Sequence, residues 1–150
     1  YQYNGWTTET GFGTPTIATH FSLVEYRATG QWYVGRYSEQ EFSAGSGTLT
    51  ANAGIALTGG TRVIPSTDAI LSTAIFDGAA SEFYENSSGP LLAGDPGSDG
   101  LVNLHVMRGS QNIAWPAVGG IMQERLMYNT NKSSDRAAIE DNINTYWGVY

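Results

Sequence analysis

Hydrophobic and polar residues alternate along much of this chain with the two-residue period of an extended strand. The clearest case is the run 18–26, in which Phe21 and Leu23 fall on one face and His20 and Ser22 on the other. Aromatic and branched residues in this run favour the same structure. We therefore predict a strand over residues 18–26.

Several other runs have strand character and stop at glycine, proline or polar turn residues. We expect strands at residues 31–37, 62–65, 70–76, 81–86, 101–107 and 120–128, and one or two more within 48–57. We expect loops at residues 38–47, 87–100 and 110–116. Asp77 and Gly78 separate two of these runs and favour a hairpin, because such a turn needs positive φ. About eight to ten short strands with no helix between them predict an antiparallel β-sandwich.

The last predicted strand places a carboxylate among apolar residues. Alternation puts Met122, Glu124, Leu126 and Tyr128 on one face. A carboxylate on a buried face needs hydrogen-bond partners. We expect a structural role for Glu124, with its partner in the backbone or in a tyrosine near the following helix, and we expect Tyr128 to be structural as well.

The period changes to that of a helix after residue 132. Ser133 or Ser134 is a suitable N-cap, and Gly148 is suited to end the helix. Helical spacing places Ile139, Ile143, Tyr146 and Trp147 on one stripe. We expect Ile139, Ile143 and Trp147 of this stripe to seal the core. The opposite side is expected to carry Arg136, Glu140, Asp141 and Asn144.

Length and composition fit one domain. The chain has 150 residues, 19 of them glycine, and only 14% are charged, which suits a β-protein with many turns. Residues 1–16 are expected to form an N-terminal arm or edge segment, followed by a single domain over residues 17–150. Because the chain begins with Tyr1, we expect a processed product or an excised domain.

The net charge of the chain disfavours some classes of binding partner. A net charge of −7, with seven Lys and Arg, disfavours nucleic acid and anionic membrane surfaces, since both need a basic face. No apolar run has the length of a membrane span. The chain has no cysteine, so disulfides are excluded and the compartment is not indicated.

Three segments carry a resemblance to a known superfamily. They are residues 73–84, residues 101–106, and residues 120–129 with the pattern Gly-x-Met-x-Glu-x-Leu-x-Tyr-Asn. They resemble, in turn, the central hairpin, the next strand and the closing strand of concanavalin A-like, laminin G-like jelly-roll domains of the lectin and glucanase superfamily, in the form found in phage and bacterial surface proteins. That family commonly continues with a polar linker and a helix ending in an aromatic residue.

The resemblance extends over residues 19–150 and implies an all-β fold. The expected architecture is a two-sheet antiparallel jelly-roll sandwich with one C-terminal α-helix. The chain departs from the family at residues 86–89, where Asn-Ser-Ser-Gly replaces the usual Asn-Gly or Asp-Gly. The implication for function is loose, because this fold hosts lectins, glycosidases and structural modules.

No catalytic or metal motif stands out in the sequence. Glycosidases of this fold resemble one another in a Glu-x-Asp-x-x-Glu strand that pairs an acid with a nucleophile, and this chain lacks the pattern. His20 and His105 have no evident third ligand for a metal. We expect no enzyme activity and no required cofactor.

Two loops hold the candidate ligand residues. Asp95 and Asp99 could bind calcium together with carbonyl oxygens, but Asp, Pro and Gly are typical of turns, which we favour. Trp115 lies beside Asn112 and is the best ligand-facing aromatic, because sugars stack on rings while polar side chains bind their hydroxyls. Packing or a subunit contact by Trp115 is an equal alternative. Trp32 and Trp147 are expected in the core.

Three functions remain open. The first is a non-catalytic surface module, such as a virion decoration, fibre or tail component, acting through protein contacts. The second is a lectin-like module that binds glycans on a host or cell surface. The third, glycoside hydrolysis, is least favoured. We expect a virion-surface or extracellular location, and a homo-oligomer in which residues 1–16 reach a neighbour.

Overall fold

The computed structural model describes residues 8–9, 15–26, 32–34, 41–45, 48–59, 69–100, 104–105 and 120–150. Side chains are described for most of these residues, but not within β1, β3, β4 or β10. The described part forms eleven strands and one helix. Their bounds are β1 Thr8–Glu9, β2 Ala18–Tyr26, β3 Trp32–Val34, β4 Glu41–Gly45, β5 Thr48–Asn52, β6 Ala56–Gly59, β7 Ala69–Phe76, β8 Ser81–Glu85, β9 Leu92–Gly94, β10 Leu104–His105, β11 Gly120–Tyr128 and α1 Arg136–Trp147.

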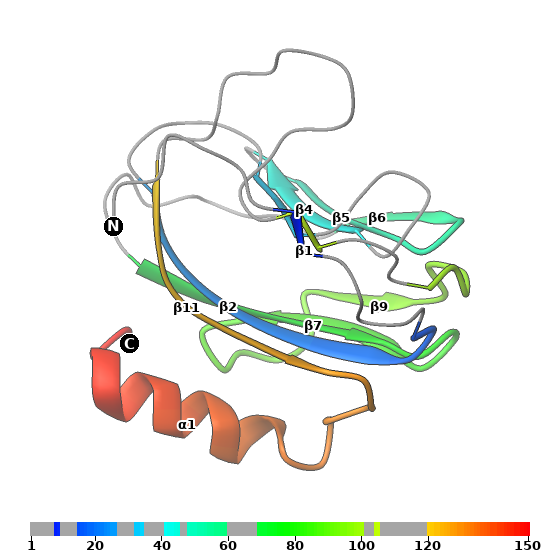
Figure 1. Ribbon diagram of the computed structural model, residues 1–150. Helices are drawn as coiled ribbons and strands as arrows, with labels where there is room; N and C mark the ends of the chain where they lie inside the picture. Colours follow the sequence, from blue (N-terminus) through cyan, green and yellow to red (C-terminus); the bar gives the residue numbers. More distant parts are fainter. Residues whose placement is uncertain are drawn as a thin grey trace.

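The strands form two main antiparallel sheets. One sheet has the order β11-β2-β7-β8-β9, and the other has the order β3-β4-β5-β6. Figure 1 shows the two sheets as facing layers, with α1 lying against the outer face of the five-stranded sheet. β1 and β10 form a separate antiparallel pair, so part of the N-terminal segment pairs within its own chain. The predicted all-β sandwich with one C-terminal helix is confirmed.

The first hydrophobic cluster lies between the two sheets. From the five-stranded sheet it takes Val24, Ile70, Ala74, Phe76, Phe83 and Leu92. From β5 and the turn after it come Leu49, Ala51 and Ala53, all nearly without exposed surface. Phe76 and Phe83 meet edge to face, with ring centroids 5.3 Å apart. Each fully buried aromatic or aliphatic side chain here stabilises the fold by about 1.5–3 kcal/mol.

The second cluster lies between the five-stranded sheet and α1. Phe21 and Leu23 from β2, Leu71 from β7, and Ile143 from α1 are all buried in it. The five-stranded sheet is therefore buried on both faces. Such a strand needs no polar face, which explains why seven consecutive residues of β7 are buried.

A buried carboxylate joins α1 to the sheet. Glu140 is only 1% exposed, and it accepts hydrogen bonds from Thr73 Oγ1 at 2.6 Å and Ser87 Oγ at 2.7 Å. Arg136, one helical turn earlier, donates from Nη1 at 2.7 Å and completes an ion pair. The Arg136 guanidinium also lies 3.8 Å from the centre of the Tyr84 ring. The helix, β7, β8 and the turn after β8 thus share one polar network.

Tyr84 takes part in that network as a neutral phenol. Burial, followed by the hydrogen bond that its hydroxyl donates to Glu82, raises the pKa of Tyr84 to about 12. The hydroxyl therefore stays protonated at neutral pH. The face of the neutral ring is contacted by the Arg136 guanidinium, which is a cation–π arrangement.

The predicted orientation of the helix was wrong in part. Arg136 and Glu140 were expected in solvent, yet with Ile143 they recur at intervals of four and three residues and share the docked face. Trp147 was expected in the core and Tyr146 on the same apolar stripe, yet Tyr146 and Trp147 are 79% and 40% exposed. The prediction assigned the docked face from apolar residues alone. In the structure this face also contains the ion pair of Arg136 and Glu140.

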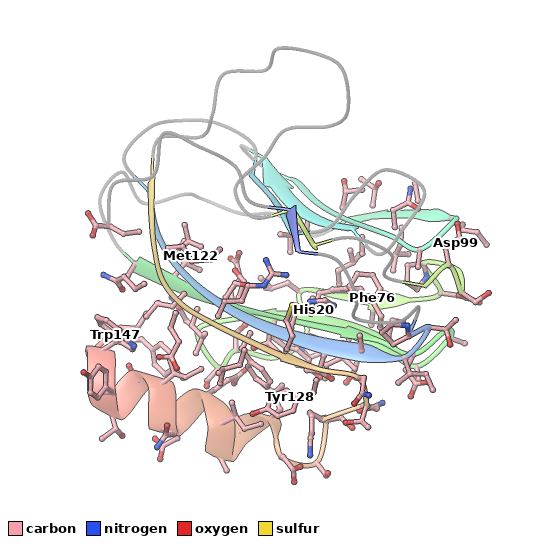
Figure 2. The ribbon with its side chains drawn as sticks, in the orientation of Figure 1. His20, Phe76, Asp99, Met122, Tyr128 and Trp147 are labelled. Atoms are coloured by element: carbon pink, nitrogen blue, oxygen red, sulfur yellow. The ribbon has the colours of Figure 1, made fainter. Side chains whose placement is uncertain are left out.

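A β-bulge changes the faces of β11. The register of β11 on β2 shifts between Met122 and Glu124, with Met122 opposite Val24 and Glu124 opposite Leu23. Met122 therefore packs in the cluster between the sheets, whereas Leu126 packs towards α1. Simple alternation had placed Met122, Glu124 and Leu126 on one face. That prediction was wrong, because one inserted residue reverses the alternation. Figure 2 shows Met122 and Tyr128 on opposite sides of the sheet.

Some predicted element bounds also differ. Residues 41–45 and 92–94, expected in loops, form β4 and β9. Residues 48–59 hold two strands, whereas the expected strand at 62–65 lies outside the described residues. The helix cap is Asp135, which makes no side-chain capping bond, rather than a serine. Gly148 ends the helix with φ of 64°, as predicted.

Replacing Glu140 with alanine tests the docking of α1. Because the change leaves Arg136 half-buried without its carboxylate, we expect the free energy of unfolding to fall by about 3–5 kcal/mol. Urea denaturation followed by circular dichroism measures this. Asp141→Ala, at the exposed next position, is the control and should change it by less than about 0.5 kcal/mol. Equal effects of the two variants would contradict the network.

Candidate functional site

Two exposed aromatic rings lie together at the C-terminal end of α1. Tyr146 and Trp147 meet edge to face, with ring centroids 5.0 Å apart and planes at 76°. We call these two residues the aromatic pair. Single exposed apolar side chains are normal, whereas two large rings side by side expose a contiguous apolar surface. Figure 2 shows Trp147 at this end of the molecule.

Glu124 fixes the position of Trp147. The indole Nε1 donates a hydrogen bond of 2.6 Å to Glu124 Oε2. The bulge in β11 turns Glu124 towards α1, where this contact becomes possible. Glu124 was expected to bond to the backbone or to a tyrosine, and its partner is a tryptophan instead. Among the described residues, Glu124 Oε1 accepts no hydrogen bond, so one carboxylate oxygen beside the ring is available to a ligand.

The chain after the helix is held by one asparagine. Asn144 Oδ1 accepts hydrogen bonds from the N–H groups of Val149 and Tyr150, at 2.8 and 2.9 Å. Asn144 Nδ2 donates to the Tyr150 carbonyl oxygen at 2.9 Å. The Tyr150 hydroxyl is hydrogen-bonded to Ser87 Oγ on the sheet side. These contacts keep the end of α1, and hence the aromatic pair, in one position.

The other residues predicted for the helix interface lie as follows. Ile143 is buried, and Ile139 and Tyr128 pack against the same cluster. The Tyr128 ring meets Phe21 edge to face at 6.0 Å between centroids. These three residues contribute to the packing of α1 on the sheet.

The acidic loop that contains Asp95 and Asp99 does not form a metal site in the described structure. Asp95 Oδ1 accepts a hydrogen bond from the Gly97 N–H at 2.9 Å, as in an Asx turn. The Asp99 N–H donates to the Ala53 carbonyl oxygen at 2.7 Å, and the Asp99 carboxylate covers Gly54. Across the described ranges, no three His, Cys, Asp or Glu side chains come together as ligands. The favoured interpretation as turns accounts for these contacts.

The remaining predicted ligand residues are not placed by this structure. Trp115 and Asn112 lie outside the described residues, so their role stays a prediction. Asp99 lies at the opposite end of the molecule from Trp147 (Figure 2), so these two predicted residues do not share a site. Tyr146 was placed on the apolar stripe of the helix, although its position in the last turn was a signal that it lies beyond the sheet.

No protein-family model matches this chain, and no curated protein matches its sequence. Its fold is similar to that of a proposed carbohydrate-binding protein from Bacteroides ovatus ATCC 8483, with a TM-score of 0.71 and 13% identity over 87% of this chain and 42% of that one. It is also similar to a tetrameric galectin from the ball sponge Cinachyrella sp., with a TM-score of 0.55 and 8% identity over 83% of this chain and 99% of that one.

These similarities show the fold alone, a β-sandwich of the jelly-roll kind. The match spans less than half of the Bacteroides ovatus protein, and both identities are too low to carry a function across. In the part of the chain that is described, no helix has both the length and the apolar character needed to cross a bilayer. The particular form found in phage and bacterial surface proteins stays a prediction.

Replacing Gly97 with alanine tests the packing of the acidic loop. A Cβ at this position would lie 2.2 Å from the Ala53 carbonyl oxygen, and φ of 97° is strained for alanine. We expect the free energy of unfolding to fall by at least about 2 kcal/mol. Gly89→Ala is the control, because nothing lies within 4 Å of its Cβ position. Thermal unfolding that is unchanged in Gly97→Ala would show that the loop is not packed in this way.

Proposed function

We propose that this protein is a non-catalytic, lectin-like module that binds glycans, with the aromatic pair as its contact surface. The observation that carries the proposal is the exposed Trp147 ring, fixed by Glu124 beside a free carboxylate oxygen. Sugars have apolar C–H faces that stack on aromatic rings and hydroxyls that donate to carboxylates. A ring and an acceptor held side by side match both features.

The fold supports the proposal independently of the site. The two solved structures similar to this chain are a proposed carbohydrate-binding protein and a galectin. We therefore rank glycan binding ahead of the virion structural role that the sequence favoured. A surface or extracellular location is part of the same proposal, because the glycans of hosts and cells are displayed there.

The proposal needs no catalytic step. Glu124 shares its described hydrogen bond with an indole, whereas glycoside hydrolysis needs a second carboxylate about 5–10 Å away. The hydrogen bond that holds the Trp147 indole on Glu124 favours binding, because an already oriented side chain loses less entropy when a ligand docks.

Binding to a glycan array tests the proposal. We expect the intact protein to bind at least one glycan class, and Trp147→Ala to weaken that binding about tenfold, since ring stacking contributes roughly 1 kcal/mol or more. Glu124→Gln should also weaken it, because the indole loses its charged acceptor. Ile55→Ala, which trims another exposed apolar side chain, is the matched control and should bind normally.

Two outcomes would count against the proposal in different ways. If the intact protein binds no glycan, the function is wrong and protein contact becomes the better explanation of the exposed rings. If binding survives in Trp147→Ala and is lost in Trp115→Ala, the glycan site is the one predicted from the sequence, and the aromatic pair has another role.

A further inference from the structure

A row of polar residues crosses the five-stranded sheet on the face that meets the other sheet. Arg125 on β11 lies opposite Ser22 on β2, which lies opposite Ser72 on β7. Ser72 in turn lies opposite Glu85 on β8. Cross-strand partners share a face, so these four side chains form one line through the interior of the sandwich. Apolar or aromatic residues occupy the rows on either side, including Val24.

Arg125 lacks the partners that such a position requires. Its Nη2 lies 3.4 Å from Nδ1 of His20, a long contact. Its Nε and Nη1 are buried and have no hydrogen-bond partner among the described residues, and the same holds for Ser72 Oγ. Buried polar atoms of folded proteins are nearly always paired, so three such atoms in one row call for an explanation.

The guanidinium cannot relieve this cost by losing its proton. Burial lowers the pKa of Arg125 to about 9, which is still well above neutral pH. A lysine could become neutral in such a place, but an arginine keeps its charge and its planar array of donors. His20 adds no negative charge at Nδ1. The carboxylate in the same row, Glu85, lies on β8, with β2 and β7 between it and Arg125, and it does not hydrogen-bond to Nε or Nη1 of the guanidinium. A second anion beside Arg125 would therefore be electrostatically favourable.

We propose that Arg125 binds the carboxylate of an acidic ligand at the β11 edge of the sandwich. A carboxylate is planar and has two acceptor oxygens, which match the paired N–H groups at the tip of a guanidinium. Among the described strands, β11 is the last of its sheet, and Arg125 as a whole residue is half-buried. Because its Nε and Nη1 atoms are themselves buried, the proposal requires a ligand that enters from this edge and displaces what covers them. The carboxylate comes from a sugar acid or from a small free carboxylate.

This site is separate from the aromatic pair. Glu124 and Arg125 are neighbours on β11 but point to opposite faces, one towards α1 and the other towards the second sheet. The proposal therefore does not rest on glycan binding by Trp147, and either can fail without the other.

The first test is thermal unfolding of the intact chain in sodium glucuronate, sodium acetate, and sodium chloride with glucose, at one pH and one ionic strength. We expect glucuronate to raise the midpoint by about 3 °C at saturation, whereas sodium chloride with glucose does not. An equal rise with acetate means that the carboxylate alone is recognised, and a rise with glucuronate alone means that a sugar acid is recognised. No rise with either carboxylate overturns the proposal.

The second test removes the guanidinium. Arg125→Met should unfold at the same or a higher temperature in sodium chloride, because it removes an uncompensated charge, and should lose the response to glucuronate. Lys132→Met removes a charge elsewhere and should respond as the intact protein does. If Arg125→Met does not fold, Arg125→Lys keeps the charge without the planar fork and should bind glucuronate about tenfold more weakly. A full response in either Arg125 variant overturns the proposal.

Discussion

The buried Glu140 carboxylate is the contact on which the arrangement of this molecule depends. A carboxylate is tolerated between a helix and a sheet only where donors surround it, and here they come from α1, β7 and the turn after β8. Since Thr73 and Ser87 lie at fixed places on the sheet side, the helix has one register in which both of them reach Glu140. That register covers the apolar face of β2 and sets where the last turn of α1 ends, and therefore where Trp147 meets Glu124.

The edge strand β11 then contributes one residue to each of the two sites for which we propose a role, Glu124 beside the aromatic pair and Arg125 at the carboxylate site. The bulge after Met122 reverses the alternation, so that Glu124 faces the helix and Arg125 faces the second sheet. An edge strand is the place in a two-layer fold where a polar side chain can belong to a buried face and still be reached from outside. The acidic loop differs in this respect, because Asp95 and Asp99 use their polar groups to hold the turn beside Ala53.

The local pattern of hydrophobic and polar residues was sufficient to predict the two longest strands and the end of the helix. The strands Ala18–Tyr26 and Gly120–Tyr128 have the predicted bounds, and Gly148 ends the helix as expected. Pattern failed for Glu41–Gly45 and Leu92–Gly94, because a short polar strand is stabilised by its neighbours rather than by its own residues. For the sites, Glu124 could be singled out as a lone carboxylate among apolar residues, but its indole partner is 23 positions away. Arg125 carried no signal, since only the register places it beside Ser22 and His20.

The amino-acid sequence by itself determined that this chain forms β-strands with a capped terminal helix, because alternation, turn residues and helix-ending glycine act over a few neighbouring residues. The tertiary structure decided which helix face docks, on which side of the sheet Met122 and Glu124 lie, and which aromatic rings stay in water. Those outcomes depend on where a bulge falls and where the sheet ends beneath the helix. Both are set by contacts between residues far apart in the chain, which no local pattern contains.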